Sequence, residues 1–301
     1  MSCVPVDGKE TCANCGKDSD GGAAKLKDCT ACRLVKYCGV DCQRAHRKQH
    51  KKACKKRAAE LEDERLYSQG LERMEGDFCP ICTLPIQLRM EAHSVFNPCC
   101  MKKICKGCDL TAKKRGIDDC PFCRTRLPDN DADALAMSHA RMAKKDPQAF
   151  SFLAGQYYYG NLGLQKDMQR AVELWTEAAE LGSNDALFGL GNAYFNGDGV
   201  QQDIAKADEL YRKAAMQGHV VSRNNLGCDE MEKGNYDRAV RHWLISAKMG
   251  YKDSLEAIKR MLIGGEATKE QYAEALRGYQ DAVEETKSHD RDEAKSLLDG
   301  Q

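Results

Sequence analysis

The pattern of hydrophobic positions divides the chain of 301 residues near residue 147. After this point the sequence has no proline and is rich in alanine and leucine. Such a stretch is typical of helices, because proline removes a backbone donor and breaks them. Before it, all seven prolines and 16 of the 17 cysteines accompany only short apolar runs. That front part cannot fold around a hydrophobic core alone, so another interaction must hold it together.

The helical part repeats itself with a period of 36 residues. The recurring positions are the pairs Gly155 and Gly191, Ala171 and Ala207, Trp175 and Tyr211, and Gly182 and Gly218. The next step shortens to 32 residues, because four residues are missing from the turn equivalent to the one around Gly197. One helix pair of this length cannot bury its apolar face alone, so successive pairs must stack. The pattern therefore predicts an α-solenoid.

Paired small residues such as Ala178-Ala179, and the turn Gly197-Asp-Gly-Val, resemble Sel-one-like repeats, which are relatives of tetratricopeptide repeats. The resemblance covers three units over 146–251 and a degenerate fourth that extends to about residue 285. It implies a scaffold that binds partner proteins on a concave face, which would be acidic here. We expect the aromatic residues of the repeats to form the core rather than to contact a ligand. Residues 286–301 are expected to form a frayed polar tail.

Composition limits the compartment and the partners. Residues 1–60 hold 14 Lys and Arg against 7 Asp and Glu, whereas those after 128 hold 21 against 29. The net charge of zero therefore combines a basic front with an acidic back. No apolar run reaches the roughly 18 residues of a membrane span, and the start has no run of signal-peptide type. We expect an intracellular protein, cytoplasmic or nuclear, without a membrane partner; its 17 cysteines should then bind metal, act in redox chemistry or be buried.

Eight candidate metal ligands lie in four close pairs between residues 12 and 54. The pairs are Cys12 and Cys15, Cys29 and Cys32, Cys38 and Cys42, and His50 and Cys54. Zinc prefers four nitrogen or sulfur ligands in a tetrahedron, and a close pair supplies two of them at small entropic cost. Eight ligands indicate two zinc ions. His46 would share a helix face with His50 and Cys54, and we assign it to packing beside the site.

This segment resembles the MYND zinc finger, above all in Tyr37-Cys38-Gly-Val-Asp-Cys42-Gln43 and His50-Lys-Lys-Ala-Cys54. The resemblance implies an interleaved arrangement, with one zinc on Cys12, Cys15, Cys38 and Cys42, and the other on Cys29, Cys32, His50 and Cys54. It also implies a surface that binds short, often proline-containing peptides, although Arg47 stands where the family often has Trp. Sites closed by four protein ligands leave no place for a substrate, so both ions should be structural.

A basic run lies on the same predicted helix as the last ligands. Residues 44–57 contain eight Lys and Arg and no aromatic residue. Such a run can bind nucleic acid or act as a nuclear localisation signal. A solvated helix face is the favoured interpretation, and the absence of aromatic side chains for base stacking argues against a nucleic-acid partner.

A second set of four cysteine pairs lies between residues 79 and 123. The pairs are Cys79 and Cys82, Cys99 and Cys100, Cys105 and Cys108, and Cys120 and Cys123. The pattern resembles an all-cysteine RING finger. This implies a cross-brace, with one zinc on Cys79, Cys82, Cys105 and Cys108, and a second on Cys99, Cys100, Cys120 and Cys123. Adjacent thiolates serve one ion only with strain, so His93 is an alternative ligand. The two fingers together predict four zinc ions.

RING fingers commonly act as ubiquitin ligases, because they bind a ubiquitin-conjugating enzyme through a small apolar patch. The family positions for this contact correspond to Ile81 and Pro121, and Leu110 would replace a missing aromatic residue. Arg124 corresponds to the basic residue that hydrogen-bonds both ubiquitin and the conjugating enzyme. Such a ligase works by positioning and needs no catalytic residue of its own. The alternative is a RING finger that only binds another protein.

The sequence thus predicts a multi-domain protein, in which two small zinc-stabilised cross-brace modules precede an all-α solenoid. The expected segments are a MYND finger at 1–57, a helical linker at 58–77, a RING finger at 78–128, a connecting helix at 129–147, the solenoid at 148–285 and the tail at 286–301. The leading hypothesis is a RING-type ubiquitin ligase, or a subunit of one, that recruits partner proteins or peptides through the MYND finger and the solenoid. The alternatives are a non-catalytic zinc-stabilised scaffold and a nuclear regulator tethered by the basic helix. Cys3 and Cys228 have no metal role in this assignment, and Cys228 should be a small core residue.

Overall fold

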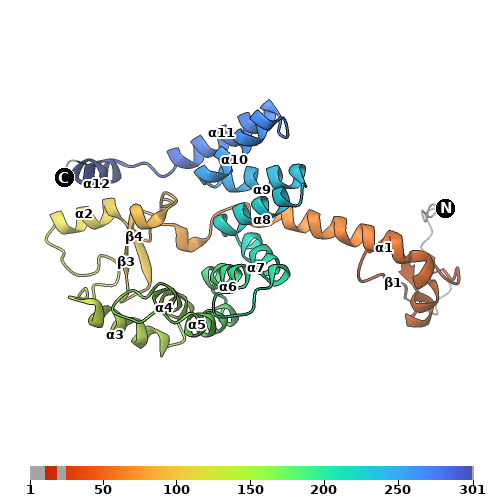
Figure 1. The fold of residues 1–301 in the computed structure, drawn as a ribbon, viewed down its shortest axis with the longest axis horizontal. Coiled ribbons are helices and arrows are strands. Elements are labelled where there is room, and N and C mark those ends of the chain that lie inside the picture. The colour runs from red at the N-terminus through yellow and green to blue at the C-terminus, as the bar shows by residue number, and fades with distance from the viewer. Residues whose placement is uncertain (1–10, 19–24, 300–301) are drawn as a thin grey trace. The chain divides into compact units, whose positions relative to one another are not determined.

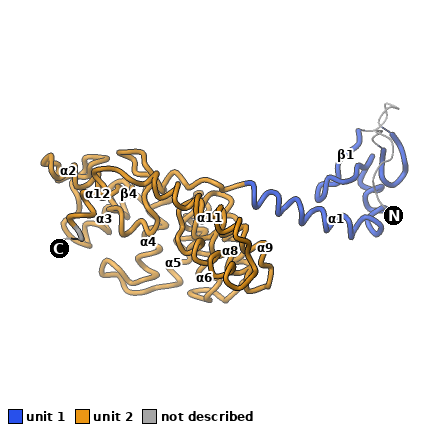
Figure 2. Tube along the Cα trace, turned by 90° about the horizontal axis from the view of Figure 1, so that it is seen from above, with its two compact units in different colours: residues 1–68 blue, residues 69–301 orange. Residues whose placement is uncertain are grey.

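A computed structural model describes residues 11–18 and 25–299 of the chain (Figure 1). Cys3 lies outside the described residues. The chain divides into two compact units, Met1–Ser68 and Gln69–Gln301, which are coloured separately in Figure 2. None of the described helices combines the length and the hydrophobicity needed to cross a membrane.

The first unit is a cysteine-rich lobe with one long helix. Strands β1 (Lys27–Asp28) and β2 (Lys36–Tyr37) pair in antiparallel fashion, and helix α1 spans Val40–Ser68. The buried core consists of Tyr37 and three of the ligand candidates, Cys12, Cys29 and Cys32. A core of this size provides too little apolar burial to hold a fold, as the sequence predicts for this part of the chain.

Helix α1 continues through the boundary predicted at residue 57. Residues 43–68 contain neither glycine nor proline, so the backbone has no reason to break there. Arg57 donates to Glu60 at 3.2 Å and to Glu64 at 2.8 Å on the same helix. The finger and most of the segment predicted as a separate linker therefore share one helix, and residues 69–77 follow its end.

The second unit begins with the second cysteine cluster. Strands β3 (Ser94–Asn97) and β4 (Lys102–Cys105) form an antiparallel hairpin in the register Val95 to Ile104, and helix α2 (Lys106–Lys114) follows directly. Single 3-10 turns lie at Glu75–Asp77 and Met90–Ala92. Four cysteines and two isoleucines make up the core, namely Cys79, Ile86, Cys100, Ile104, Cys105 and Cys120. This module, like the first, depends on its ligand candidates for its interior.

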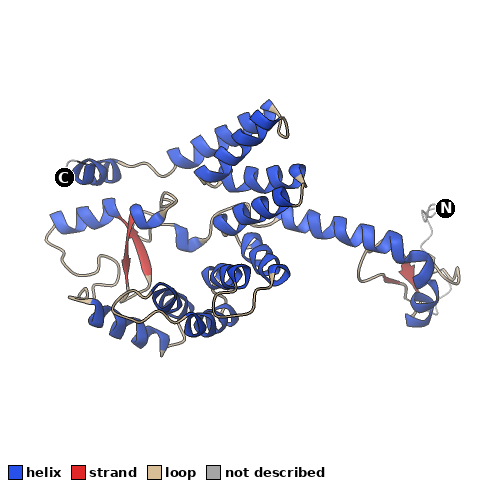
Figure 3. Cartoon of the chain, in the orientation of Figure 1, coloured by secondary structure: helices blue, strands red, loops and turns tan. Residues whose placement is uncertain are grey.

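The rest of the unit is helical, as Figure 3 shows. The helices are α3 (Asp131–Met142), α4 (Pro147–Tyr159), α5 (Met168–Glu180), α6 (Asn184–Asn196), α7 (Ile204–Met216), α8 (Val220–Glu232), α9 (Tyr236–Lys248), α10 (Lys252–Gly264) and α11 (Lys269–Glu284). Consecutive helices from α4 onward pack against each other. This arrangement confirms the predicted α-solenoid.

The residues that recur in the sequence have structural reasons to do so. Asp167 and Asp203 cap the N-termini of α5 and α7, where their side chains accept backbone N–H groups of the first turn. A Cβ atom at Gly191 would lie 2.5 Å from the ring of Tyr211, and one at Gly227 would lie 2.5 Å from that of Trp243. The glycine of one helix therefore admits the buried aromatic ring of the next.

The end of the chain differs from the predicted polar tail. Residues 289–299 form helix α12 (His289–Asp299), which packs against α2. Ala294 is buried, and Glu293 forms an ion pair with Lys114 of α2. The prediction failed because the helix has a mostly polar sequence, and its binding surface lies far away along the chain.

Candidate functional site

The ligand candidates gather into four clusters. In each cluster the four ligand atoms lie within 4.8 Å of one another. The clusters are Cys12, Cys15, Cys38 and Cys42; Cys29, Cys32, His50 and Cys54; Cys79, Cys82, Cys105 and Cys108; and Cys99, Cys100, Cys120 and Cys123. In both cysteine-rich modules the first pair joins the third and the second joins the fourth. The structure thus brings together the sets that the two resemblances imply.

Sulfur separations in these clusters suit zinc. A zinc ion bonded at about 2.3 Å to tetrahedral thiolates holds their sulfur atoms about 3.8 Å apart. The Sγ atoms of Cys82 and Cys105 are 3.8 Å apart, and so are those of Cys100 and Cys120. Three clusters offer four sulfurs and the remaining one offers three sulfurs and an imidazole, which are the donor sets of structural zinc sites. The donor sets and the sulfur separations confirm the prediction that zinc is the cofactor.

Four Cys-x-x-Cys segments share one backbone shape that aims both thiols inward. The residue after the second cysteine has a positive φ in each segment: Gly16 at 71°, Arg33 at 54°, Thr83 at 60° and Arg124 at 62°. Its N–H donates to the carbonyl oxygen of the first cysteine, at 2.8 Å for Thr83 and 2.9 Å for Arg124. Residues other than glycine are disfavoured at positive φ, so contacts with the surrounding structure must stabilise this turn.

The ambiguous ligands take definite places. Cys99 and Cys100 both lie in the fourth cluster, and His93 lies outside it. His46 is buried next to the second cluster, where its Nδ1 is 3.1 Å from the hydroxyl of Tyr37 and its ring stacks on that of His50. His46 thus supports the ring of a ligand candidate, as expected of a neighbouring residue.

Neighbouring groups set the thiol pKa values far apart. Burial raises the pKa of Cys54 to about 12, and the hydrogen bond with Cys42 raises the pKa of Cys38 to about 12. At Cys12 burial opposes ionisation, but backbone hydrogen bonds from Cys15 and nearby residues lower the pKa to about 6. Some thiols therefore keep their protons until a cation displaces them, and zinc affinity should fall as the pH falls.

The residues expected to contact a conjugating enzyme lie on the second cysteine module. Ile81 is 42% exposed, Arg124 is exposed, and Leu110 and Pro121 are half-buried. Sequence reasoning missed Phe122, which is 45% exposed and precedes its second cysteine as Ile81 does. The repeated Cys-Pro-apolar-Cys pattern was the available signal.

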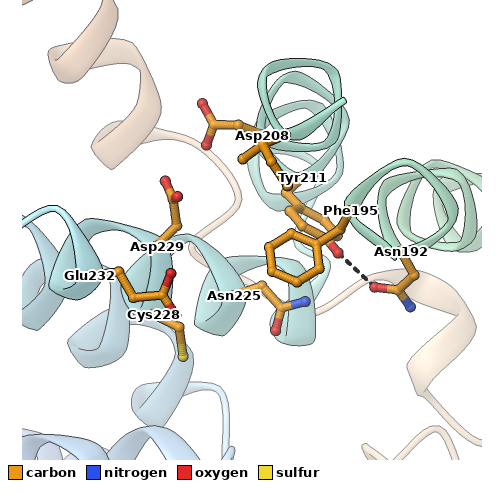
Figure 4. Close-up of a pocket in the computed structure, with 9 residues that line it drawn as sticks. Asn192, Phe195, Asp208, Tyr211, Asn225, Cys228, Asp229 and Glu232 are labelled. Atoms are coloured by element: carbon orange, nitrogen blue, oxygen red, sulfur yellow. Dashed lines mark hydrogen bonds between the residues drawn. The ribbon is translucent and has the colours of Figure 1, made fainter. Parts of the chain in front are cut away.

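A pocket of about 280 Å³ opens between α6, α7 and α8 (Figure 4). Phe195, Ile204 and Tyr211 supply apolar surface, and Tyr211 donates a hydrogen bond to Asn192 at 2.7 Å. Three carboxylates also line it, namely Asp208, Asp229 and Glu232. The sequence did not predict this pocket, because the repeat pattern does not distinguish buried aromatic residues from Phe195, which is 43% exposed.

One carboxylate of this pocket has an unused acceptor. The Oδ2 atom of Asp208 accepts from Arg212 at 2.8 Å, whereas its buried Oδ1 atom has no hydrogen-bond partner. Cys228, expected to be a core residue, is half-buried and lines the same pocket. The pocket therefore combines apolar contact surface with carboxylates that can complement a cationic group.

A second hollow lies between the solenoid and the second cysteine module. Its volume is about 440 Å³, and Tyr158 of α4 and Phe188 of α6 line it together with residues 88–91 of the second cysteine module. Arg89, which is one of these lining residues, donates to Asp253 at 3.3 Å. Basic and acidic side chains both line this hollow, whereas the charged residues that line the pocket between α6, α7 and α8 are all acidic, so that pocket has the clearer preference for one kind of partner.

Comparison with known families identifies two of the three predicted parts. Residues 12–54 match the MYND finger, and residues 151–183, 184–219 and 223–251 match the Sel1 repeat. The resemblance of residues 79–124 to a RING finger has no such match. MYND fingers and Sel1 repeats are protein-interaction modules. No curated protein matches the chain.

Three solved structures are similar to this chain. A protective antigen of uropathogenic Escherichia coli strains, which displays an SLR fold, is 27% identical with a TM-score of 0.45 over 62% of this chain and 38% of its own. A Sel1 repeat protein from Oxalobacter formigenes is 20% identical with a TM-score of 0.46 over 60% and 71%. Protein 5086 of Pseudomonas aeruginosa is 17% identical with a TM-score of 0.31 over 73% and 87%.

Proposed function

We propose, from the premise that a MYND finger and three Sel1 repeats share this chain, that the protein is a non-catalytic, zinc-stabilised interaction scaffold. The solenoid would bind a short peptide in the pocket between α6, α7 and α8. The observation that carries this proposal is the combination of exposed apolar side chains and carboxylates in one pocket. A peptide with an apolar side chain next to Lys or Arg complements both features.

Residues of the pocket could contact both the apolar side chain and the cationic group of such a peptide. Phe195 and Ile204 are 43% and 42% exposed, so an apolar side chain could remove their surface from water. Glu232, an exposed carboxylate of the pocket, could accept from the cationic group of the peptide. Arg212 and Lys233 pair with Asp208 and Asp229, so Glu232 adds a further negative charge beside the peptide.

The zinc-loaded full chain should prefer such peptides on a synthetic array. The array presents Leu, Ile or Phe next to Lys or Arg, and in matched positions next to Glu or Ser. Phe195→Ala and Glu232→Gln should each weaken binding about tenfold, because each removes one complementary contact. Met231→Ala is the control, since Met231 is 39% exposed but does not line the pocket. Equal binding of the Glu-containing and Lys-containing peptides would contradict the assignment.

A RING-type ubiquitin ligase, or a subunit of one, is the second candidate function. Two observations favour it: the interleaved pairing of residues 79–123, and the exposure of Ile81 and Phe122 in equivalent places. A conjugating enzyme would then be the partner of Ile81, Leu110, Pro121 and Arg124. The module would act by holding that enzyme and ubiquitin together, without catalytic residues of its own.

Autoubiquitination in vitro decides between the two functions. With a panel of conjugating enzymes, a ligase should form chains that Ile81→Ala and Arg124→Ala reduce about tenfold or more, because both remove partner contacts. Leu71→Ala is a suitable control, since Leu71 is 52% exposed and precedes the cysteine module. Absence of chains with every enzyme would exclude the ligase and leave the scaffold.

A further inference from the structure

Arg291 of helix α12 reaches the first zinc cluster of the second cysteine module. Its Nη2 atom lies 3.3 Å from the Sγ atom of Cys82 and 3.2 Å from the carbonyl oxygen of Leu84. Its Nη1 atom donates to the carbonyl oxygens of Pro85 at 2.6 Å and Thr286 at 2.7 Å. One guanidinium therefore spans a ligand candidate, the loop that follows it and its own segment.

Other thiols of the clusters accept hydrogen bonds from backbone N–H groups, whereas Cys82 accepts one from Arg291. Cys79 and Cys105 receive N–H groups from Cys105 and Cys108, at 3.4 and 3.5 Å. In the first finger, the thiol of Cys32 similarly receives the N–H of Leu34 at 3.5 Å. At Cys82 the corresponding donor is the side chain of Arg291, from 209 residues further along the chain.

Helix α12 can approach this site because of Gly107, which lies between Cys105 and Cys108. A Cβ atom at Gly107 would lie 2.8 Å from the backbone N of Arg291. Any larger residue would therefore push the start of α12 away from the cluster. The ion pair between Lys114 and Glu293 and the burial of Ala294 hold the helix along α2.

The negative charge of a zinc site with four thiolates favours a cationic donor such as Arg291. Four thiolates around one Zn²⁺ leave a net charge of about −2, which partly buried surroundings solvate poorly. A guanidinium is planar and permanently charged, so it can donate to a thiolate and to carbonyl oxygens at once. Groups that hydrogen-bond metal ligands typically change metal affinity by about 10- to 100-fold.

We propose that Arg291 is a positioning residue for the Cys79, Cys82, Cys105 and Cys108 zinc site, and that α12 completes this module from the far end of the chain. Arg291 does not bind the ion. It neutralises the thiolate cluster and fixes the loop 82–85, and so slows the loss of zinc from this one site.

Zinc release from the full chain tests this proposal. The protein is mixed with an excess of a chromogenic chelator, and cysteines that lose zinc are alkylated and identified by mass spectrometry. Arg291→Gln should accelerate the release of one ion about tenfold or more, with alkylation confined to Cys79, Cys82, Cys105 and Cys108. Arg291→Lys should restore part of the protection, because it keeps the charge but loses the planar fork.

Two further variants separate this role from general stability. Lys295→Gln removes an exposed cation one turn further along the same helix face and should release zinc at the wild-type rate. Gly107→Ala should reproduce the effect of Arg291→Gln, because it displaces the start of α12. Release from Arg291→Gln at the rate of Lys295→Gln would overturn the proposal. So would equal alkylation of Cys99, Cys100, Cys120 and Cys123, because that pattern indicates unfolding of the whole module.

Discussion

Removal of zinc from the full chain should unfold both cysteine-rich modules and leave the solenoid helices of residues 147–284 folded. The reason is the composition of the cores. Among the described residues, Tyr37 is the only buried member of the first core cluster that is not a ligand candidate, and the second module adds only Ile86 and Ile104. Zinc contributes on the order of 10 kcal/mol per site in such modules. The solenoid has its own core around Leu153, Leu174 and Trp243.

Peptide-resolved amide hydrogen exchange, before and after chelation, measures this outcome. Protection should be lost across 12–54 and 79–123, retained across 147–284, and restored when zinc is added back. Elemental analysis should give about four zinc ions per chain. Cys79→Ser should lose about one of them, whereas Cys228→Ser should lose none, because Cys228 lies outside all four clusters. Loss of protection in the solenoid on chelation would show that the helices depend on zinc.

The metal clusters were predictable because each ligand pair is close together in the sequence. Each Cys-x-x-Cys pair places two thiols together through a single turn, so spacing alone identifies Cys12 and Cys15, or Cys79 and Cys82, as partners. Which pair joins which followed only from the resemblance to known fingers. The choice of His50 over His46 also followed from pairing, and the structure gives His46 its own partner in Tyr37.

The solenoid was predictable for a similar reason. Its period reflects contacts between adjacent helices, because the contact of Gly191 with Tyr211 recurs in the next unit as that of Gly227 with Trp243. Contacts that occur only once leave no such record. The stacking of Phe96 on Phe152, with centroids 4.4 Å apart, joins the second cysteine module to α4 and has no counterpart in the repeats.

Helix α12 shows where sequence reasoning stops. Its polar sequence has few apolar positions, and Arg291 contacts Cys82 across 209 residues. Gly107 was the one local sign, since a glycine next to a metal ligand often marks a close approach of another backbone. Gly107 indicates that another part of the chain packs closely here, but it does not identify α12 as that part.

Replacing Trp243 by alanine should destabilise the solenoid by about 3–5 kcal/mol. Trp243 is 1% exposed, lies in the core cluster of α9 to α11, and fits against Gly227 of the preceding helix. Denaturant unfolding of the zinc-loaded chain, followed by its helical signal, measures the loss. Tyr236→Ala is the matched control, because Tyr236 is 44% exposed at the start of the same helix and should cost about 0.5 kcal/mol or less. Equal losses for the two variants would contradict the packing described here.

The same site allows a sharper test through a double-mutant cycle. In the wild-type chain, Gly227→Ala should destabilise by about 1–3 kcal/mol, because the new methyl group would lie 2.5 Å from Nε1 of Trp243. In the Trp243→Ala background the ring is gone, and the same change should instead stabilise by up to about 1 kcal/mol, since alanine favours helix. A reversal of sign shows that the two residues are energetically coupled, as direct packing of the ring on the glycine predicts. It would therefore explain why glycine stands at 191 and 227, because an aromatic ring from the next helix needs the space at both places.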